Sequence, residues 1–251
     1  MVLGAGTAFA EPSVEITKVK LVDARNGTVE YAYTVSGDFE DWNWDLIVKV
    51  TSDDGTKAAV LTIKDVTAGT VNTNVNVKGL LGKAYPGVSF FAELKKVGVQ
   101  LWADGPYFAE CNVGATKPEE YGGLYTFIGD KAKEAAESFR KGWRLPTKAE
   151  FLALLKDENC DRNATSLNGV RGFRFSGKGA YSSKSIFIPA AGEDFGKGYR
   201  YKAGEEGFCW TSDSAGGDYA WTLAQNLTSA NTTHILCSWG LSVRAVRGAA
   251  E

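Results

Sequence analysis

Apolar and polar positions alternate along much of the first hundred residues. Val29, Tyr31, Tyr33 and Val35 fall on every second position, the pattern of a strand with one buried face. Between Val29 and the preceding apolar run lies Arg25-Asn26-Gly27-Thr28, and an Asn-Gly pair in this setting predicts a tight hairpin. Further segments show strand patterning and are separated by turn residues: 14–21, 44–50, 58–63, 71–77 and 88–94. About seven short strands predict an immunoglobulin or fibronectin-III-like sandwich over residues 13–98.

One loop of this predicted sandwich is rich in aromatic and acidic residues. It reads Asp41-Trp42-Asn43-Trp44-Asp45. Tryptophans at such positions commonly fill a core, so we expect Trp44 to be structural. The loop as a whole, with Trp42, remains a candidate binding loop.

The pattern changes near Val99, where helical spacing appears. Ala132, Ala135, Ala136 and Phe139 share one face of a predicted helix at 130–141. A second helix is expected to begin at Thr147, because Thr147 and Glu150 form a capping box. Its apolar face is Phe151, Leu154 and Leu155. Short strands and loops follow from Asn168 onward, so residues 99–251 are predicted to be α+β.

The segment 207–247 combines regular and irregular patterning. Tyr219, Trp221 and Leu223 alternate with smaller residues, which predicts a half-buried strand with these three side chains inward. The stretch 234–239 has large apolar side chains without a clean period. We expect a buried scaffold with a ligand surface between its members, and the scaffold residues are Trp210, Leu223, Val243 and Val246.

Composition and charge limit the classes of function. The chain has 251 residues, a net charge of −2, and seven Trp, ten Tyr, thirteen Phe and 29 Gly. The near balance of charge gives no indication of nucleic-acid binding. No apolar run approaches the roughly 20 residues of a transmembrane helix.

Residues 1–12 are interpreted as a leader. Within it, Ala8-Phe9-Ala10 resembles a signal-peptidase site, but no basic region precedes it. A disordered leader is the alternative.

The four cysteines are Cys111, Cys160, Cys209 and Cys237, widely spaced and without a C-x-x-C pair. With a single histidine in the chain, zinc binding is not expected. If the protein is exported, the cysteines can oxidise, and three pairings are open. Free, buried thiols are the other interpretation.

Five motifs in the second half carry a resemblance to a known family: 109–115 (AECNVGA), 142–151 (GWRLPTKAEF), 186–192 (IFIPAAG), 208–210 (FCW) and 240–244 (GLSVR). Together they resemble the Fibrobacter succinogenes major paralogous domain, which is similar to the formylglycine-generating-enzyme branch of the C-type lectin fold. The resemblance covers about residues 100–247. It implies a C-type lectin fold for 99–251, as in the variable proteins of diversity-generating retroelements, whose variable segment lies at the C-terminus. The variable region would then be 207–247.

Catalysis is the less favoured hypothesis. The resembling oxidases use a pair of closely spaced cysteines to bind copper, and here Cys209 and Cys237 are far apart in sequence. A Ser-His-Asp arrangement would have to use His234, the only histidine. Asp213 and Asp218 are candidates for a carboxylate pair, but their segment is typical of a turn. The triplets with which C-type lectins bind sugar through calcium do not occur in this domain. We therefore expect no cofactor and no metal.

The favoured hypothesis is a non-catalytic receptor or adhesin with a variable binding surface. We expect Thr222, Ala224 and Asn226 to point to solvent. The predicted ligand-binding residues are Cys209, Thr211, Asp213, Thr222, Ala224, Asn226, His234, Leu236, Cys237 and Trp239. Exposed aromatic residues beside Asn and Ser are typical of protein-binding surfaces, so a protein ligand is preferred to a free carbohydrate. The alternatives are a formylglycine-generating-enzyme-like oxidase and a structural surface or phage-fibre module. The expected location is secreted or at the cell surface, with a phage particle as the alternative.

Two arginines are assigned to the scaffold. Arg144 and Arg244 each lie inside a family motif, and we expect their guanidinium groups to bind backbone carbonyls or a carboxylate such as Glu150.

Overall fold

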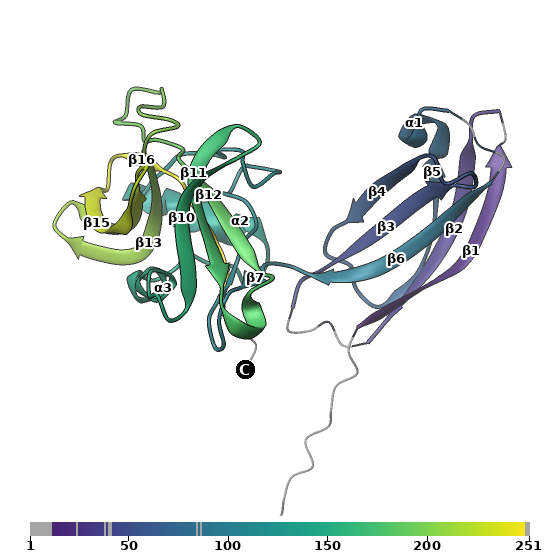
Figure 1. Ribbon diagram of the computed structural model, residues 1–251, viewed down its shortest axis with the longest axis horizontal. Coiled ribbons are helices and arrows are strands. Elements are labelled where there is room, and N and C mark those ends of the chain that lie inside the picture. Colours follow the sequence, from purple (N-terminus) through teal and green to yellow (C-terminus); the bar gives the residue numbers. More distant parts are fainter. Residues whose placement is uncertain are drawn as a thin grey trace, which may run out of the picture. The chain divides into compact units, whose positions relative to one another are not determined.

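A computed structural model describes residues 12–23, 25–37, 39, 42–83, 85 and 87–248. The protein is mostly β-strand with few helices, arranged in several small sheets (Figure 1). The chain folds into two compact units, Met1–Val97 and Gly98–Glu251. The expected leader 1–12 lies outside the described residues except for Pro12.

The first unit contains two three-stranded antiparallel sheets. One has the order β1-β2-β5, formed by Ser13–Asp23, Thr28–Ser36 and Gly69–Asn76. The other has the order β4-β3-β6, formed by Ala58–Ile63, Trp44–Ser52 and Val88–Lys96. The described part of this unit therefore has six strands, one fewer than predicted, and a short helix α1 (Val77–Leu81) follows β5.

The buried faces of the two sheets form one core. Val29, Tyr31, Tyr33 and Val35 of β2 are buried, which confirms the predicted face, and they pack in one cluster with Leu46, Val48 and Val50 of β3. The predicted hairpin at Asn26-Gly27 is confirmed, with Gly27 at φ +65° between β1 and β2.

The two tryptophans of the aromatic loop have different environments. Trp42 is buried and its indole N–H donates to the carbonyl of Val97 at 3.1 Å. Trp44 is only partly buried and contacts Phe39 edge-on. Trp42 is therefore the more buried of the two, and Asp41 lies outside the described residues.

The second unit places two short helices beside four small sheets. The helices are α2 (Lys131–Phe139) and α3 (Lys148–Leu154). The two larger sheets are β10-β11-β12 (Cys160–Leu167, Val170–Gly177, Ser185–Pro189) and β13-β14-β15 (Gly207–Gly216, Tyr219–Gln225, Ala230–Leu236). The two smaller sheets are β16-β9 (Gly240–Leu241, Tyr125–Thr126) and β17-β8-β7 (Val246–Arg247, Tyr107–Phe108, Val99–Gln100).

One core joins these elements. Phe151 and Leu154 of α3 pack with Phe173 of β11, Ile188 of β12 and Leu223 of β14. Both predicted helices are confirmed: α2 buries its three alanines, and the capping box of α3 is complete, with the Thr147 hydroxyl accepting from the Glu150 amide. All four predicted scaffold residues of segment 207–247 are buried: Trp210, Leu223, Val243 and Val246.

Arg244 is a fully buried charged residue in this core. Its guanidinium donates to Asn112 Oδ1 at 3.0 Å, to the Ala109 carbonyl at 2.9 Å and to the Phe187 carbonyl at 2.8 Å. Burial lowers the pKa of Arg244 below its ordinary value. The predicted scaffold role is confirmed, because the group binds backbone carbonyls of two separate segments.

Candidate functional site

Four of the ten predicted ligand-binding residues are buried. Cys209, Thr211, Thr222 and Cys237 have side chains that solvent barely reaches. The Thr211 hydroxyl donates to the Trp221 carbonyl at 2.9 Å and accepts from the Asp213 amide at 3.1 Å. Their assignment to a ligand surface is therefore wrong, because their side chains belong to the interior of the second unit.

Strand β14 has the opposite orientation to the predicted one at its first half. Ala220 and Thr222 are fully buried, whereas Tyr219 is 42% exposed and Trp221 is partly exposed. The reason lies on the neighbouring strand: Trp210, fully buried, is the register partner of Thr222 and so lies on the same face. Small residues on β14 leave room for the indole, and the aromatic side chains of β14 point to the other face.

The other face of β14 is covered at one end only. Leu223 packs against the apolar residues of α3 in the main core, as predicted. From Leu223 back toward the start of the strand, the same face carries Trp221 and then Tyr219, and the exposure of these side chains increases in that order. The sheet thus presents a continuous row of side chains that emerges from the core into solvent.

His234 of β15 joins this row. It is exposed and is the register partner of Trp221. Its ring lies edge-on to both aromatic neighbours, 5.4 Å from Tyr219 and 5.7 Å from Trp221 between centroids. We call Tyr219, Trp221 and His234 the aromatic face. Leu236, partly buried, is the register partner of Tyr219 and borders it.

Lys148, at the start of α3, supports the aromatic face from the helix side. Its ammonium lies 3.0 Å from the centroid of the Trp221 ring, a cation–π contact. The sequence predicts neither Tyr219 nor Lys148 as a site residue. Alternation on a strand favours a core position for large aromatic residues, and no local signal in the sequence relates Lys148 to Trp221.

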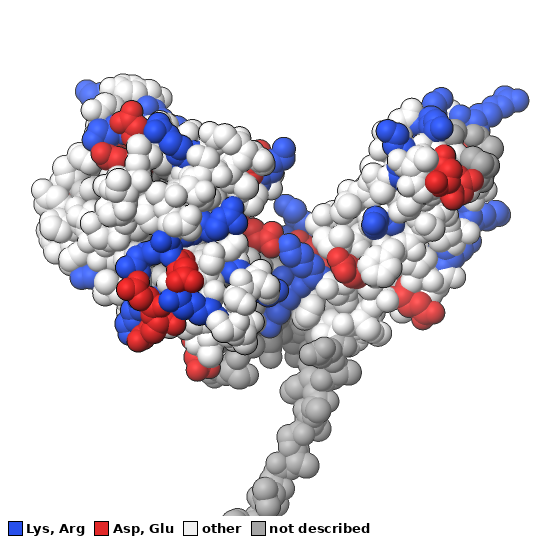
Figure 2. All heavy atoms as spheres, viewed as in Figure 1, with Lys and Arg blue, Asp and Glu red and all other residues white. Residues whose placement is uncertain are grey.

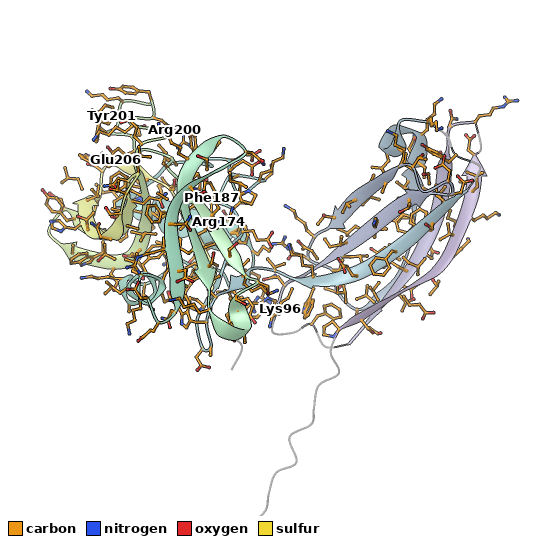
Figure 3. The ribbon with its side chains drawn as sticks, in the orientation of Figure 1. Lys96, Arg174, Phe187, Arg200, Tyr201 and Glu206 are labelled. Atoms are coloured by element: carbon orange, nitrogen blue, oxygen red, sulfur yellow. The ribbon has the colours of Figure 1, made fainter. Side chains whose placement is uncertain are left out.

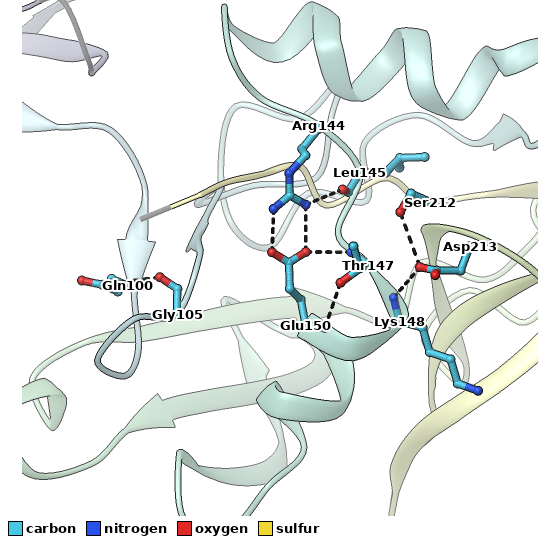
Figure 4. Close-up of polar contacts among 9 residues, drawn as sticks. All are labelled: Gln100, Gly105, Arg144, Leu145, Thr147, Lys148, Glu150, Ser212 and Asp213. Atoms are coloured by element: carbon cyan, nitrogen blue, oxygen red, sulfur yellow. Dashed lines mark hydrogen bonds and ion pairs between the residues drawn. The ribbon is translucent and has the colours of Figure 1, made fainter. Parts of the chain in front are cut away.

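An irregularity in β13 holds the strand to α3. Trp210 pairs with Thr222 and Ser214 with Ala220, so three residues of β13 lie opposite one residue of β14. The bulge directs Asp213 toward the helix, where its carboxylate accepts from the Lys148 amide at 2.7 Å (Figure 4). The adjacent Ser212 amide donates to the Pro146 carbonyl at 2.8 Å. Asp213 therefore satisfies the first backbone amide of α3. This structural role accounts for the residue, and no ligand is needed to explain it.

The Arg144–Glu150 pair lies beside this junction. Arg144 forms two hydrogen bonds to the Glu150 carboxylate, at 2.8 and 2.7 Å, and a third to the Leu145 carbonyl (Figure 4). Burial raises the pKa of Glu150, but hydrogen bonds from Arg144 and the Thr147 amide outweigh it, and the pKa lies below its ordinary value. The predicted scaffold role of Arg144 is confirmed.

The remaining predicted residues lie away from the aromatic face. Asn226 Oδ1 accepts from the amides of Thr228 and Ser229, so it closes the turn between β14 and β15. Ala224 is partly buried and shares a face with Phe208 and Asn231, opposite to the aromatic face.

Trp239 belongs to a second aromatic cluster. Its ring lies 4.3 Å from Phe195, which lies 5.2 Å from Tyr201. The loop 193–206 is closed at its base by backbone hydrogen bonds between Asp194 and Gly240 and between Glu193 and Tyr201. Arg200, Tyr201 and Glu206 of this loop lie at one end of the second unit (Figure 3).

A buried acid lies at the base of this loop. Glu193 is 4% exposed and its Oε2 has no hydrogen-bond partner within the described residues. Burial, with the nearby Glu206 carboxylate, raises the pKa of Glu193 to about 7. A neutral carboxyl is the form that this environment favours at slightly acid pH.

All four cysteines are free thiols. Burial raises the pKa of Cys160 and of Cys209 to about 11.

Within the described part of the chain, no group of three or more His, Cys, Asp or Glu side chains could hold a metal ion. In the same residues, no helix is both long and apolar enough to cross a bilayer. Acidic and basic side chains are interspersed on the face of the second unit that Figure 2 shows.

Comparisons with known proteins find no match for the chain among protein-family models, curated proteins or solved structures.

Proposed function

We propose that this chain is a non-catalytic ligand-binding protein whose second unit has the C-type lectin fold and displays a variable surface. The first unit would be an immunoglobulin-like sandwich that carries the binding unit. The aromatic face is the observation on which the proposal rests. It combines exposed rings with a rigid, buried strand framework, which is the arrangement of protein-binding paratopes.

The physical properties of the aromatic face favour a protein as ligand. Tyrosine and tryptophan supply large contact areas at low cost in side-chain entropy. The His234 ring lies edge-on to both Tyr219 and Trp221, so part of the ordering cost of binding is met before the ligand arrives. An aromatic surface of this kind, without a described sugar-sized pocket between its rings, fits the surface of another protein better than a free sugar. A secreted or cell-surface location, or a phage particle, is part of the same proposal.

The framework also supports variation of the exposed residues. Side chains that face solvent on β14 and β15 lie outside the core cluster, whereas Trp210, Thr222 and Leu223 beside them are buried. Replacement of exposed residues is expected to change stability by less than about 0.5 kcal/mol each. The segment can therefore change its binding properties while the fold is retained.

The genomic locus provides the direct test. We expect a near-copy of the coding sequence for residues 207–247 close to a reverse-transcriptase gene. Its mismatches are expected at codons for the exposed residues Tyr219 and His234 and their partly exposed neighbours Trp221 and Leu236. A flanking sequence without such a copy, or mismatches concentrated at Trp210, Thr222 and Val243, would overturn the proposed diversification.

A further inference from the structure

A groove opens between α2 and the segment Arg144–Thr147, next to the aromatic face. Its volume is about 370 Å³, which is within the range of ligand pockets. Phe127 and Leu145 form its apolar part, and Ser212 of β13 lines it from the side of the sheet. The variable surface proposed for β14 and β15 does not include this groove.

The apolar part of the groove is held in place by the core. The Phe127 ring packs against Trp210 with 5.4 Å between centroids, and its amide donates to the Cys237 carbonyl at 3.0 Å. Leu145 is 4% exposed. Because its walls are anchored in this way, the groove exists before any ligand binds, and an entering apolar group needs little rearrangement of the protein.

The rim of the groove carries a small net negative charge. Lys133 and Glu137 of α2 line it, together with Asp130 directly before the helix, and none of the three side chains has a hydrogen bond or ion pair within the described residues. Arg144, on the opposite rim, is neutralised by its pair with Glu150. The carboxylates of Asp130 and Glu137 and the ammonium of Lys133 therefore give the rim one net negative charge. This charge favours a ligand that carries a positive charge beside its apolar part.

Two pairs of neighbouring residues lie between the groove and the aromatic face. Ser212 and Thr147 line the groove. Asp213 and Lys148, which follow them in sequence, are joined by a hydrogen bond, and the Lys148 ammonium contacts the Trp221 ring. A partner that covers the aromatic face can thus reach the groove with an adjacent segment.

We propose that this groove is an anchor pocket for a protein partner, and that it receives an aromatic or branched aliphatic side chain next to a lysine or arginine. The inference rests on the proposed protein-binding function and names the partner chemistry for that site. The apolar side chain displaces water from the exposed part of Phe127 and from the surface beside Leu145. The basic neighbour pairs with Asp130 or Glu137.

Two small probes test the groove without any knowledge of the partner. Phenethylamine and 3-phenylpropionate have the same ring but opposite charge at neutral pH. We expect phenethylamine to shift the NMR signals of Phe127, Leu145 and Lys133 with an affinity at least about threefold higher than that of 3-phenylpropionate. Equal affinities, or shifts that map to another part of the chain, would overturn the inference.

Charge variants at Asp130 and on α2 sharpen the same experiment. The exposed pair of substitutions Asp130→Lys and Glu137→Lys is expected to reverse the preference between the probes. Glu134→Lys makes the same change of charge as Glu137→Lys alone, but Glu134 pairs with Lys131 and does not line the groove, so the preference should remain. An equal effect of Glu134→Lys would mean that only the overall charge is sensed and would contradict the proposal.

A blocking variant separates this inference from the proposed function. Ser212→Trp is expected to fill the groove and abolish the binding of both probes, while the exposed position keeps the fold intact. If the probes do not bind but the genomic repeat is present, the pocket is wrong and the variable surface stands. If they bind as expected but no repeat exists, the pocket stands without diversification.

Discussion

Arg244 Nε lies 3.0 Å from Oδ1 of Asn112, a residue 132 positions earlier in the chain. The same guanidinium bonds the carbonyls of Ala109 and Phe187, so three segments of the second unit meet at one side chain. Asn112 is itself buried and donates to the Tyr121 carbonyl at 3.0 Å. These bonds join the end of the chain to the beginning of the unit.

Arg244→Ala is predicted to destabilise the second unit by about 3–5 kcal/mol, because it leaves three buried acceptors without a donor. Urea unfolding followed by tryptophan fluorescence measures the loss. Arg244→Lys should recover only part of it, since an ammonium cannot reproduce the planar guanidinium. The exposed Arg171→Ala is the matched control; a similar loss in both variants would contradict the role of Arg244.

Glu150→Gln is predicted to lower the free energy of unfolding at pH 7 by about 1–2 kcal/mol, the contribution of charge-assisted hydrogen bonds. Because the pKa of Glu150 is below its ordinary value, this stability is present above the unfolded-state pKa of about 4.3. It is lost as pH falls through the folded-state pKa. Denaturant titrations at pH 7 and pH 3 should show the two proteins converging in acid. Glu158→Gln, at an exposed position, is the matched control.

Glu193→Gln is predicted to stabilise the protein at pH 8 by roughly 1–3 kcal/mol, as one pKa unit corresponds to 1.36 kcal/mol. The pKa of Glu193 is raised to about 7, so the folded state retains a proton that the unfolded state has released. The wild-type protein therefore loses stability as pH rises from about 4.5 to 7. Unfolding at pH 5 and pH 8 measures the difference between variant and wild type, which should be smaller at pH 5. A difference independent of pH would show that Glu193 does not titrate in this range.

Thr222→Leu is predicted to destabilise the protein by about 1–3 kcal/mol, because the larger side chain must fit beside the buried Trp210. His234→Leu, at an exposed position on the neighbouring strand β15, should change stability by less than about 0.5 kcal/mol. Thermal unfolding of both variants makes the comparison. If the two substitutions cost the same, Thr222 does not lie on the inward face of β14.

The thiols are predicted to react slowly in the folded protein. All four are free, and burial raises their pKa values, to about 11 for Cys160 and Cys209. The thiolate is the reactive form, so an aromatic disulfide reagent at pH 7 should react at least about tenfold faster after denaturation. Four equivalents are expected in denaturant, and reductant should leave the melting temperature unchanged. A drop on reduction would indicate a disulfide.

Features that depend on neighbouring residues in sequence could be predicted. The Asn26-Gly27 turn, the Thr147–Glu150 capping box and the alanine face of α2 each require only a few adjacent positions. The expected burial of the apolar face of β2 is also confirmed. Only one face of this strand is apolar, so the sequence alone identifies the face that is buried.

The candidate site depended on contacts between distant residues, and there the prediction failed in part. Alternation places Tyr219 and Trp221 on one face and Ala220 and Thr222 on the other, but it does not say which face is inside. Trp210 determines which face is inside. Its buried indole lies on the same face as Thr222, so that face of β14 has room only for small side chains.

Polar residues of β13 show the same dependence on distant contacts. Thr211 and Asp213 have the sequence pattern of ordinary polar surface residues. Only the bulge in β13 shows that they bond to the Trp221 carbonyl and the Lys148 amide. No spacing within β13 itself indicates either partner.

The small sheet β17-β8-β7 has a consequence for how this unit can be used. Val99 and Val246 are both register partners of Phe108, so the points where the chain enters and leaves the unit are two strand spacings apart, about 10 Å. A module with adjacent ends can be inserted into a loop of a host protein without distorting either partner. The unit from 98 to 248 is thus suited to transplantation as a cassette, with its aromatic face displayed on whichever carrier receives it.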